Sequence, residues 1–114
     1  MSERVDAVVI GAGVIGLAVG RALAMAGREV IVLEKNAAFG EETSARNSEV
    51  VHAGIQYKPD GVRASLAVRG RDALYQFCAE HKVNYARCGK LLVGIGEAEV
   101  AGLKALKANA EQNG

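Results

Sequence analysis

Residues 5–16 read VDAVVIGAGVIG, and this stretch decides the fold of the N-terminal half of the chain. The apolar run over residues 5–10 shows no clear alternation, which is the pattern of a strand buried on both faces of a parallel sheet. A G-x-G-x-x-G motif follows from Gly11 and opens a helix expected over residues 14–26, which Gly27 ends. Strand, glycine-rich turn and helix in this order predict the first half of a Rossmann-type unit.

A second buried strand is expected over residues 29–34, which read EVIVLE. The interval between the strands leaves room for the right-handed crossover helix that parallel pairing requires. Glu34 closes this strand where such units place an acid, and its carboxylate can accept hydrogen bonds from both hydroxyls of an adenosine ribose. The same charge would repel a 2′-phosphate, which argues against NADP. The sequence therefore predicts a βαβ unit that holds the ADP half of a dinucleotide.

Each glycine of the motif has a physical task. Gly11 permits the tight turn out of the strand, Gly13 lets the backbone approach a pyrophosphate, and Gly16 lets the helix pack close to the sheet. The N–H groups at the start of the helix then meet the phosphate charge. The motif by itself does not separate FAD from NAD.

The remaining chain predicts a loop, two helices and a strand region. Residues 36–60 are polar, hydroxyl-rich and punctuated by glycine, which indicates a functional loop with one short helix. Residues 85–95 predict one or two strands, and residues 97–113 predict a helix. Between them, after a turn at residues 59–61, the sequence predicts a helix whose apolar stripe contains Val62, Leu66, Ala73, Leu74, Phe77 and Cys78.

Composition limits the class of protein. The 114 residues are 50% hydrophobic and 24% charged, enough for one core, and the formal net charge of +1 gives little electrostatic support for binding nucleic acid. Cys78, His81 and Cys88 lack a fourth ligand at a suitable spacing, so we expect no metal site. Two cysteines are too few for a disulfide framework, and the uncharged run at residues 7–20 is too short to span a bilayer. These features favour a cytoplasmic protein.

The loop after the βαβ unit carries a more specific pattern. Residues 43–48 read TSARNS and residues 51–55 read VHAGI. This TS-x-x-NS-x-x-x-HAG segment resembles the N-terminal part of the D-amino-acid-oxidase-like (DAO) superfamily of flavoproteins. Together with RNSEVVHAGIQYKP and RCGKLLVGIG, it is most similar to the L-2-hydroxyglutarate dehydrogenase/oxidase branch. The resemblance runs essentially from residue 5 to residue 114.

This resemblance implies that the cofactor is FAD and that the βαβ unit grips its ADP moiety. The residue matching His52 lies close to the isoalloxazine ring in that family, so His52 is the candidate catalytic residue, as a general base or as a group that orients substrate. From the motif and the resemblance together, the expected cofactor-binding residues are Gly11, Gly13, Val14, Ile15, Gly16, Glu34, Lys35, Thr43, Ser44, Arg46, Asn47, Ser48, His52 and Gly54.

The predicted fold class is α/β, with a Rossmann-like FAD-binding βαβ unit in a partial three-layer parallel sheet with flanking helices. Residues 1–84 are expected to form the N-terminal FAD-binding region, and residues 85–114 the start of a substrate domain. Flavoproteins of this type contain several hundred residues. We therefore expect this chain to be a fragment of a two-domain flavoprotein, inactive alone.

The resemblance implies an FAD-dependent oxidoreductase that takes a hydride from a 2-hydroxy acid such as L-2-hydroxyglutarate. The alternatives are an FAD-dependent amine or amino-acid oxidase, a glycerol-3-phosphate dehydrogenase relative, an NAD-binding dehydrogenase and a non-catalytic dinucleotide-binding module. The expected partners are a small hydroxy-acid or amine substrate and an electron acceptor, oxygen or a quinone. No nucleic acid partner is expected, and membrane association of the whole enzyme stays open.

Overall fold

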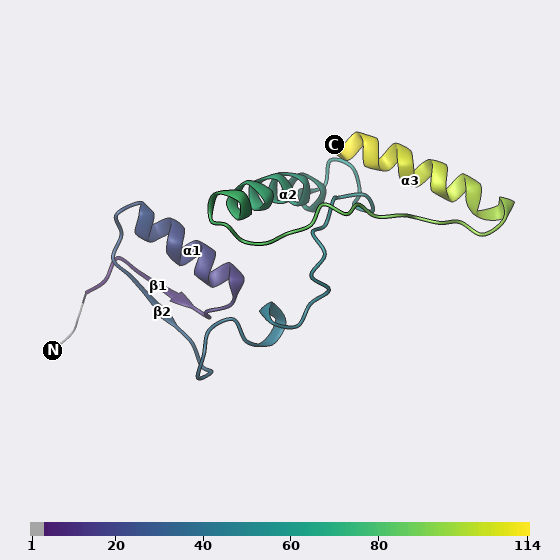
Figure 1. Ribbon diagram of the computed structural model, residues 1–114. Helices are drawn as coiled ribbons and strands as arrows, with labels where there is room; N and C mark the ends of the chain where they lie inside the picture. Colours follow the sequence, from purple (N-terminus) through teal and green to yellow (C-terminus); the bar gives the residue numbers. More distant parts are fainter. Residues whose placement is uncertain (1–3) are drawn as a thin grey trace. The chain divides into compact units, whose positions relative to one another are not determined.

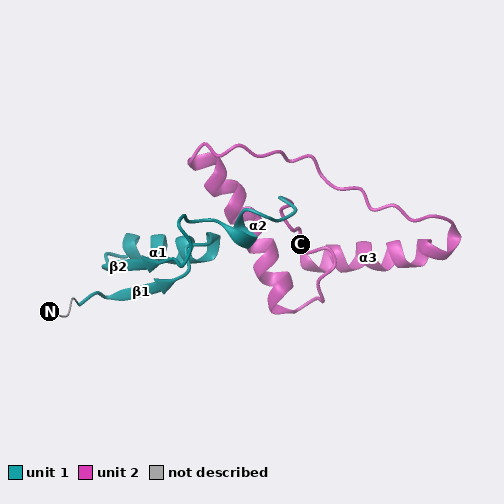
Figure 2. Ribbon diagram, turned by 90° about the horizontal axis from the view of Figure 1, so that it is seen from below, with its two compact units in different colours: residues 1–49 teal, residues 50–114 magenta. Residues whose placement is uncertain are grey.

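The computed structural model describes residues 4–114. Two compact units divide the chain, residues 1–49 and residues 50–114, and Figure 2 colours them separately. Each unit has its own secondary structure and its own contacts, and the two are described in turn.

The first unit contains a βαβ arrangement. Strand β1 spans Ala7–Ile10, helix α1 spans Val14–Met25, and strand β2 spans Val30–Leu33. The strands pair in parallel along their whole length, with the first residue of β1 opposite the first of β2. The predicted βαβ unit is confirmed, with each strand shorter than expected. The short helix predicted in the following loop is the 3₁₀ turn η1, Glu42–Ser44.

Helix α1 packs against one face of this sheet (Figure 1), and small residues allow the close approach. Gly20 is buried, and a Cβ added there would lie 3.2 Å from Val32 Cγ2. A Cβ on Gly16 would collide with the carbonyl oxygen of Gly11. The absence of a side chain at these two positions therefore sets how closely the helix approaches the strands.

The expectation that both strands are buried on both faces is wrong for this chain. The exposed fractions of Val8, Ile10 and Leu33 are 51%, 87% and 52%. In the part of the chain that the structure describes, the sheet consists of β1 and β2 alone, and α1 covers one face. The other face therefore stays open to solvent, and residues 4–114 do not form the fuller three-layer sheet.

The second unit is built on two helices. Helix α2 spans Val62–Glu80, and helix α3 spans Val100–Asn113 after a 3₁₀ turn, η2, at Glu97–Glu99. Both helices occur where the sequence predicts them. On α3, Leu103, Leu106 and Ala110 are partly buried, whereas Val100 is 44% exposed.

The predicted apolar stripe of α2 is partly wrong. Cys78 is buried as expected, but Val62 and Leu66 are 74% and 57% exposed. The less exposed side runs instead through Ala64, Val68, Arg71, Tyr75 and Cys78. The buried side of α2 was predicted wrongly because it depends on what the helix packs against and not on residue type alone. One packing partner is the backbone near Gly54, which lies against Val68.

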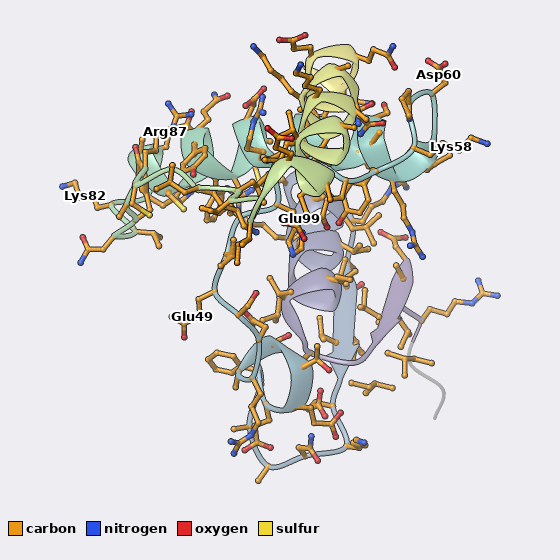
Figure 3. All side chains as sticks on the ribbon, turned by 90° about the vertical axis from the view of Figure 1, so that its right-hand side faces the viewer. Glu49, Lys58, Asp60, Lys82, Arg87 and Glu99 are labelled. Carbon is orange, nitrogen blue, oxygen red and sulfur yellow. The ribbon has the colours of Figure 1, made fainter. Side chains whose placement is uncertain are left out.

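No strand forms between residues 85 and 95, where one or two were predicted. A strand needs a hydrogen-bonded partner, and within residues 4–114 the only paired strands are β1 and β2. The start of this segment is held by side chains instead. The ring centroids of Tyr85 and Tyr75, which is on α2, lie 5.2 Å apart. The guanidinium carbon of Arg87, labelled in Figure 3, lies 4.1 Å from the centroid of the Tyr75 ring.

The backbone at Gly54 gives the first testable prediction. Its φ is +83°, in the left-handed region, and an added Cβ would lie 3.0 Å from Val68 Cγ2. We expect Gly54→Ala to lower the free energy of unfolding by about 1–2 kcal/mol, because the backbone strain and the close contact act together. Urea denaturation followed by circular dichroism measures this change.

Gly70 supplies the matched control. It lies within α2, and a Cβ added there would meet open space. Gly70→Ala should therefore raise the free energy of unfolding by roughly 0.5–1 kcal/mol through helix propensity. Changes of the same sign in the two variants would contradict the interpretation of Gly54.

Candidate functional site

A pocket of about 510 Å³ lies in the first unit, where β1 and β2 end. Ligands of open α/β sheets bind outside the carboxyl ends of the strands, so this pocket is the candidate site. Its walls come from the glycine-rich loop, the end of β2 and the η1 turn. The lining residues are Ile10, Gly11, Gly13, Leu33, Glu34, Lys35, Asn36, Glu41, Glu42, Thr43 and Ser44.

The carboxylate of Glu34 joins two sides of this pocket. The Ala12 N–H donates to Oε2 at 2.8 Å, and the Asn36 N–H donates to Oε1 at 2.9 Å. These two donors, Asn36 first, hold the pKa of Glu34 below its ordinary value of 4.5. Glu34 is therefore ionised at neutral pH, directly beside the glycine-rich loop.

Ser44 caps helix α1 from a distant part of the sequence. The Val14 N–H, the first of the helix, donates to Ser44 Oγ at 2.9 Å, and the N-cap residue Gly13 makes no side-chain cap. A Cβ on Gly13 would lie 3.1 Å from the same oxygen. Ser44 thus satisfies a helix N–H in place of an N-cap side chain and fastens the η1 turn to the glycine-rich loop.

An ion pair joins two residues of the pocket wall, Lys35 and Glu42. Lys35 Nζ lies 2.7 Å from Glu42 Oε1, and Asn36 Nδ2 donates to the same oxygen at 3.4 Å. The pair raises the pKa of Lys35 and lowers that of Glu42. Because both side chains are exposed, the pair contributes little stability. Its effect is local, since it anchors Glu42, whose φ of +58° is unusual for a residue with a side chain.

Asn47 organises the chain after η1. Its Nδ2 donates to the carbonyl oxygens of Ser44 and Thr43 at 3.1 and 3.3 Å, and its Oδ1 accepts from the Glu49 N–H at 2.8 Å. Glu49 also has a positive φ, +54°, and its side chain points outward in Figure 3. Asn47 therefore supports a strained turn. The neighbouring residues Arg46 and Ser48 are exposed.

His52 and Gly54 belong to the second unit. His52 is exposed, and its Nδ1 lies 3.3 Å from the hydroxyl oxygen of Tyr57. The two rings are stacked, with centroids 6.3 Å apart and an interplanar angle of 19°. Tyr57 therefore orients the imidazole of His52 by a hydrogen bond and by ring contact.

The predicted site residues thus fall into groups. Six line the pocket, namely Gly11, Gly13, Glu34, Lys35, Thr43 and Ser44. Val14 contributes a backbone N–H to the same region, Gly16 packs behind the loop, and Ile15 is 78% exposed. Asn36, Glu41 and Glu42 also line the pocket and were not predicted from the sequence. The position of Asn36, two residues after the strand-end acid, was a usable signal, whereas acids inside a polar loop give none.

Comparison with known proteins identifies the class. Residues 6–114 match the family described as FAD dependent oxidoreductase, and this match covers nearly the whole chain. The chain therefore belongs to that family. FAD is the cofactor of the family, so the predicted cofactor and the predicted DAO resemblance are confirmed.

Several relatives carry the name L-2-hydroxyglutarate dehydrogenase, mitochondrial. The Arabidopsis thaliana protein is 51% identical over 111 residues, which are 97% of this chain and 23% of the relative. The Homo sapiens protein is 39% identical over 111 residues, 96% of this chain and 24% of the relative. The Nematostella vectensis protein is 38% identical over 115 residues, 99% of this chain and 25% of the relative. The chain thus spans about a quarter of their length.

The residues of the pocket fit the ADP moiety of FAD. A pyrophosphate needs backbone N–H donors and a close approach of the chain, and Gly11 and Gly13 line the pocket next to the start of α1. A ribose needs an acceptor for its hydroxyls. The ionised carboxylate of Glu34 is in place for that contact and is already oriented by two backbone amides.

The Ser44 cap gives a prediction on stability. Ser44→Ala removes the acceptor of the Val14 N–H, and we expect the free energy of unfolding to fall by about 1 kcal/mol. Ser48→Ala, an exposed serine in the same loop, should change it by less than about 0.5 kcal/mol. Urea denaturation compares the two variants, and a larger loss for Ser48→Ala would contradict the assignment of the cap.

Glu34 gives a prediction on pH. Because its pKa is lowered on folding, its stabilising contribution is complete above the ordinary value of 4.5 and is lost as pH falls through the folded value. The free-energy difference between wild type and Glu34→Gln should therefore be constant near pH 7 and shrink below about pH 4.5. Urea denaturation of both proteins between neutral and acid pH measures this difference. A difference that does not depend on pH would disprove the proposed bonds to the carboxylate.

Proposed function

We propose that this chain forms the FAD-binding part of an enzyme that oxidises a 2-hydroxy acid, with L-2-hydroxyglutarate as the expected substrate. The observation that carries the proposal is the Glu34 carboxylate, held by the N–H groups of Ala12 and Asn36 in the pocket that Gly11 and Gly13 line. The names of the relatives point to the substrate.

In this proposal the first unit holds the ADP moiety. The N–H groups of Ile15 and Gly16 face the pyrophosphate, because the first N–H groups of a helix have no acceptor within it. Glu34 accepts from the ribose hydroxyls, and it can do so while bound to two amides because a carboxylate has about four acceptor sites. Further polar contacts along the pyrophosphate and ribityl chain are proposed for Thr43, Ser44, Arg46, Asn47 and Ser48. Val14 and Lys35 are proposed as further cofactor-binding residues.

The contribution of the second unit to the reaction is His52. When bound, the flavin supplies a hydride acceptor for the carbon that bears the substrate hydroxyl. His52 is proposed to act on that substrate hydroxyl, either by orienting it or by taking its proton. The hydrogen bond to Tyr57 supports this role, because a group that handles a proton must be held in a fixed orientation. Gly54 is proposed to leave room beside it.

The other expectations also stay proposals. Residues 85–114 are proposed to begin a substrate domain, and oxygen or a quinone is proposed to take up the electrons. The proposed location is the cytoplasm. The alternative is the mitochondrion, because the names of the relatives contain the word mitochondrial. Among residues 4–114, no helix has the length and apolar character needed to cross a membrane.

The visible absorption spectrum tests the cofactor and the substrate together. We expect the purified enzyme that contains this chain to show flavin bands, and we expect L-2-hydroxyglutarate added without oxygen to bleach them. Bleaching by an amine or by glycerol 3-phosphate instead would move the protein to one of the alternative flavoenzymes. A colourless protein that binds NAD and not FAD would overturn the proposal.

A matched pair of variants locates the cofactor in the described pocket. Glu34→Gln should weaken FAD binding by roughly tenfold or more, because a hydrogen bond to a charged acceptor contributes about 1.5–3 kcal/mol. Glu41 lines the same pocket and is exposed, so Glu41→Gln serves as the control. Fluorescence titration with FAD compares them. Equal affinities for FAD would place the ribose elsewhere.

A further inference from the structure

Two asparagines on α3 hold the turn that follows His52. Asn109 Nδ2 donates to the carbonyl oxygens of Ile55 and Tyr57 at 2.7 and 2.9 Å. Asn113 Nδ2 donates to the carbonyl oxygens of Gly54 and Tyr57, both at 2.9 Å. Figure 1 shows the end of α3 next to the loop that precedes α2, where this turn lies. Residues 54–57 are thus fastened by side chains more than 50 positions away in the sequence.

We call Asn109 and Asn113, with their four hydrogen bonds to residues 54–57, the clamp, and every side-chain N–H group of these asparagines is used in it. An asparagine amide has two N–H groups, and both Asn109 and Asn113 use both of theirs on the turn. The carbonyl oxygen of Tyr57 accepts two bonds, and that of Gly54 accepts one from Asn113 and one from the Tyr57 N–H at 3.2 Å. Because the asparagines are partly buried, a lost bond is only partly replaced by water. The spacing of four residues puts both on one face of the helix.

The opposite side of the turn is fixed by α2. The backbone of Gly54 is buried in the left-handed region, and a Cβ there would approach Val68 Cγ2 to 3.0 Å and the Ala64 carbonyl oxygen to 3.9 Å. The turn is therefore held between α2, which leaves little room for a side chain at Gly54, and α3, which supplies four hydrogen bonds. A residue on this turn has little freedom to move.

The turn carries the partner of His52. The Tyr57 hydroxyl lies 3.3 Å from His52 Nδ1, and the two rings are stacked. His52 itself is exposed, so packing does little to fix its ring. Its orientation depends on where Tyr57 is, and the Tyr57 backbone is the group on which both asparagines converge.

We propose that Asn109 and Asn113 are positioning residues that set the orientation of the His52 imidazole through the backbone of Tyr57. The importance of this orientation for the reaction rests on the function proposed above, whereas the coupling itself does not. Within residues 4–114, the side-chain hydrogen bonds of both asparagines go to the turn and not to His52, so the asparagines act through the turn. The hydrogen bonds to the turn require a side chain that donates twice at each position. Aspartate has the same shape as asparagine but cannot donate these bonds.

The imidazole ¹⁵N chemical shifts of the ligand-free full chain test the coupling directly. The chain has two histidines, so His81 serves as the internal reference for His52. Four proteins are compared with wild type: Asn109→Asp/Asn113→Asp, Asn109→Ala/Asn113→Ala, Tyr57→Phe and the control Gln112→Ala. Gln112 is an exposed amide on α3, and the hydrogen bonds to residues 54–57 found within residues 4–114 include none from it.

We expect both double variants to move the His52 shifts in the direction that Tyr57→Phe moves them, with His81 unchanged and Gln112→Ala silent. Adding either double change to Tyr57→Phe should then produce little further movement, because the same link is already broken. Unchanged His52 shifts, with faster hydrogen exchange in residues 54–57, would show a purely structural clamp and overturn the proposal. If a double variant does not fold, Asn109→Ala and Asn113→Ala, each keeping two bonds, are judged by the same criteria.

A second readout separates this inference from the proposed function. In the flavin-loaded enzyme, Asn109→Ala/Asn113→Ala should lower kcat on the order of tenfold or more, because a small misplacement of a reacting group is costly. The Kd for FAD should change much less than kcat, since the proposed ADP contacts lie in the first unit. A wild-type protein that binds no FAD would overturn the proposed function and leave the coupling measured by NMR intact.

Discussion

The hydrogen bonds accepted by the Glu34 carboxylate are the constraint on which the pocket depends. Parallel pairing brings the ends of β1 and β2 together, and the Gly11 N–H still donates to the Leu33 carbonyl oxygen at 2.7 Å. The glycine-rich loop leaves the sheet after Gly11. Glu34 holds that loop because one carboxylate oxygen accepts a hydrogen bond from the Ala12 N–H. Its other oxygen accepts from the Asn36 N–H and fixes the chain that leaves β2. One ionised side chain thus links the two walls, and the Gly40 N–H, which donates to the Ala12 carbonyl oxygen at 2.9 Å, holds the same loop.

Two of the side chains that a dinucleotide would contact, Ser44 and Glu34, already have partners within the chain. Binding at these two side chains is therefore an addition of hydrogen bonds to atoms that already have partners. Ser44 Oγ accepts from Val14, yet its own hydrogen remains available to donate to an anion. Glu34 has acceptor sites beyond the two that the amides use. Both residues can keep their structural bonds while they bind a ligand. The site is consequently preorganised, which lowers the entropy lost on binding.

The sequence predicted the parts of this structure whose cause is local. The βαβ unit follows from two apolar runs and a glycine motif, and the helix boundaries at Val14 and near Gly27 follow from backbone chemistry confined to a few residues. The strand predicted over residues 85–95 failed because strand formation depends on a partner that the segment itself does not specify. The stripe of α2 failed for a related reason, since Ala64 is buried by what it packs against and not by its own hydrophobicity. The clamp of Asn109 and Asn113 left only a weak trace, two asparagines four residues apart.

Polar contacts, more than bulk burial, determine the positions of the loops that carry the candidate site. The buried apolar side chains are small, those of Ala12, Ala64 and Cys78, whereas larger ones such as Ile10 remain exposed among the described residues. Small buried side chains bring little apolar area out of water, so they specify a loop conformation only weakly. Ser44, Asn47 and the two asparagines of α3 provide the directional bonds that packing does not. Replacing one of these polar residues therefore removes more of the interactions that hold its loop in place than replacing an apolar residue on the exposed face of β1 would.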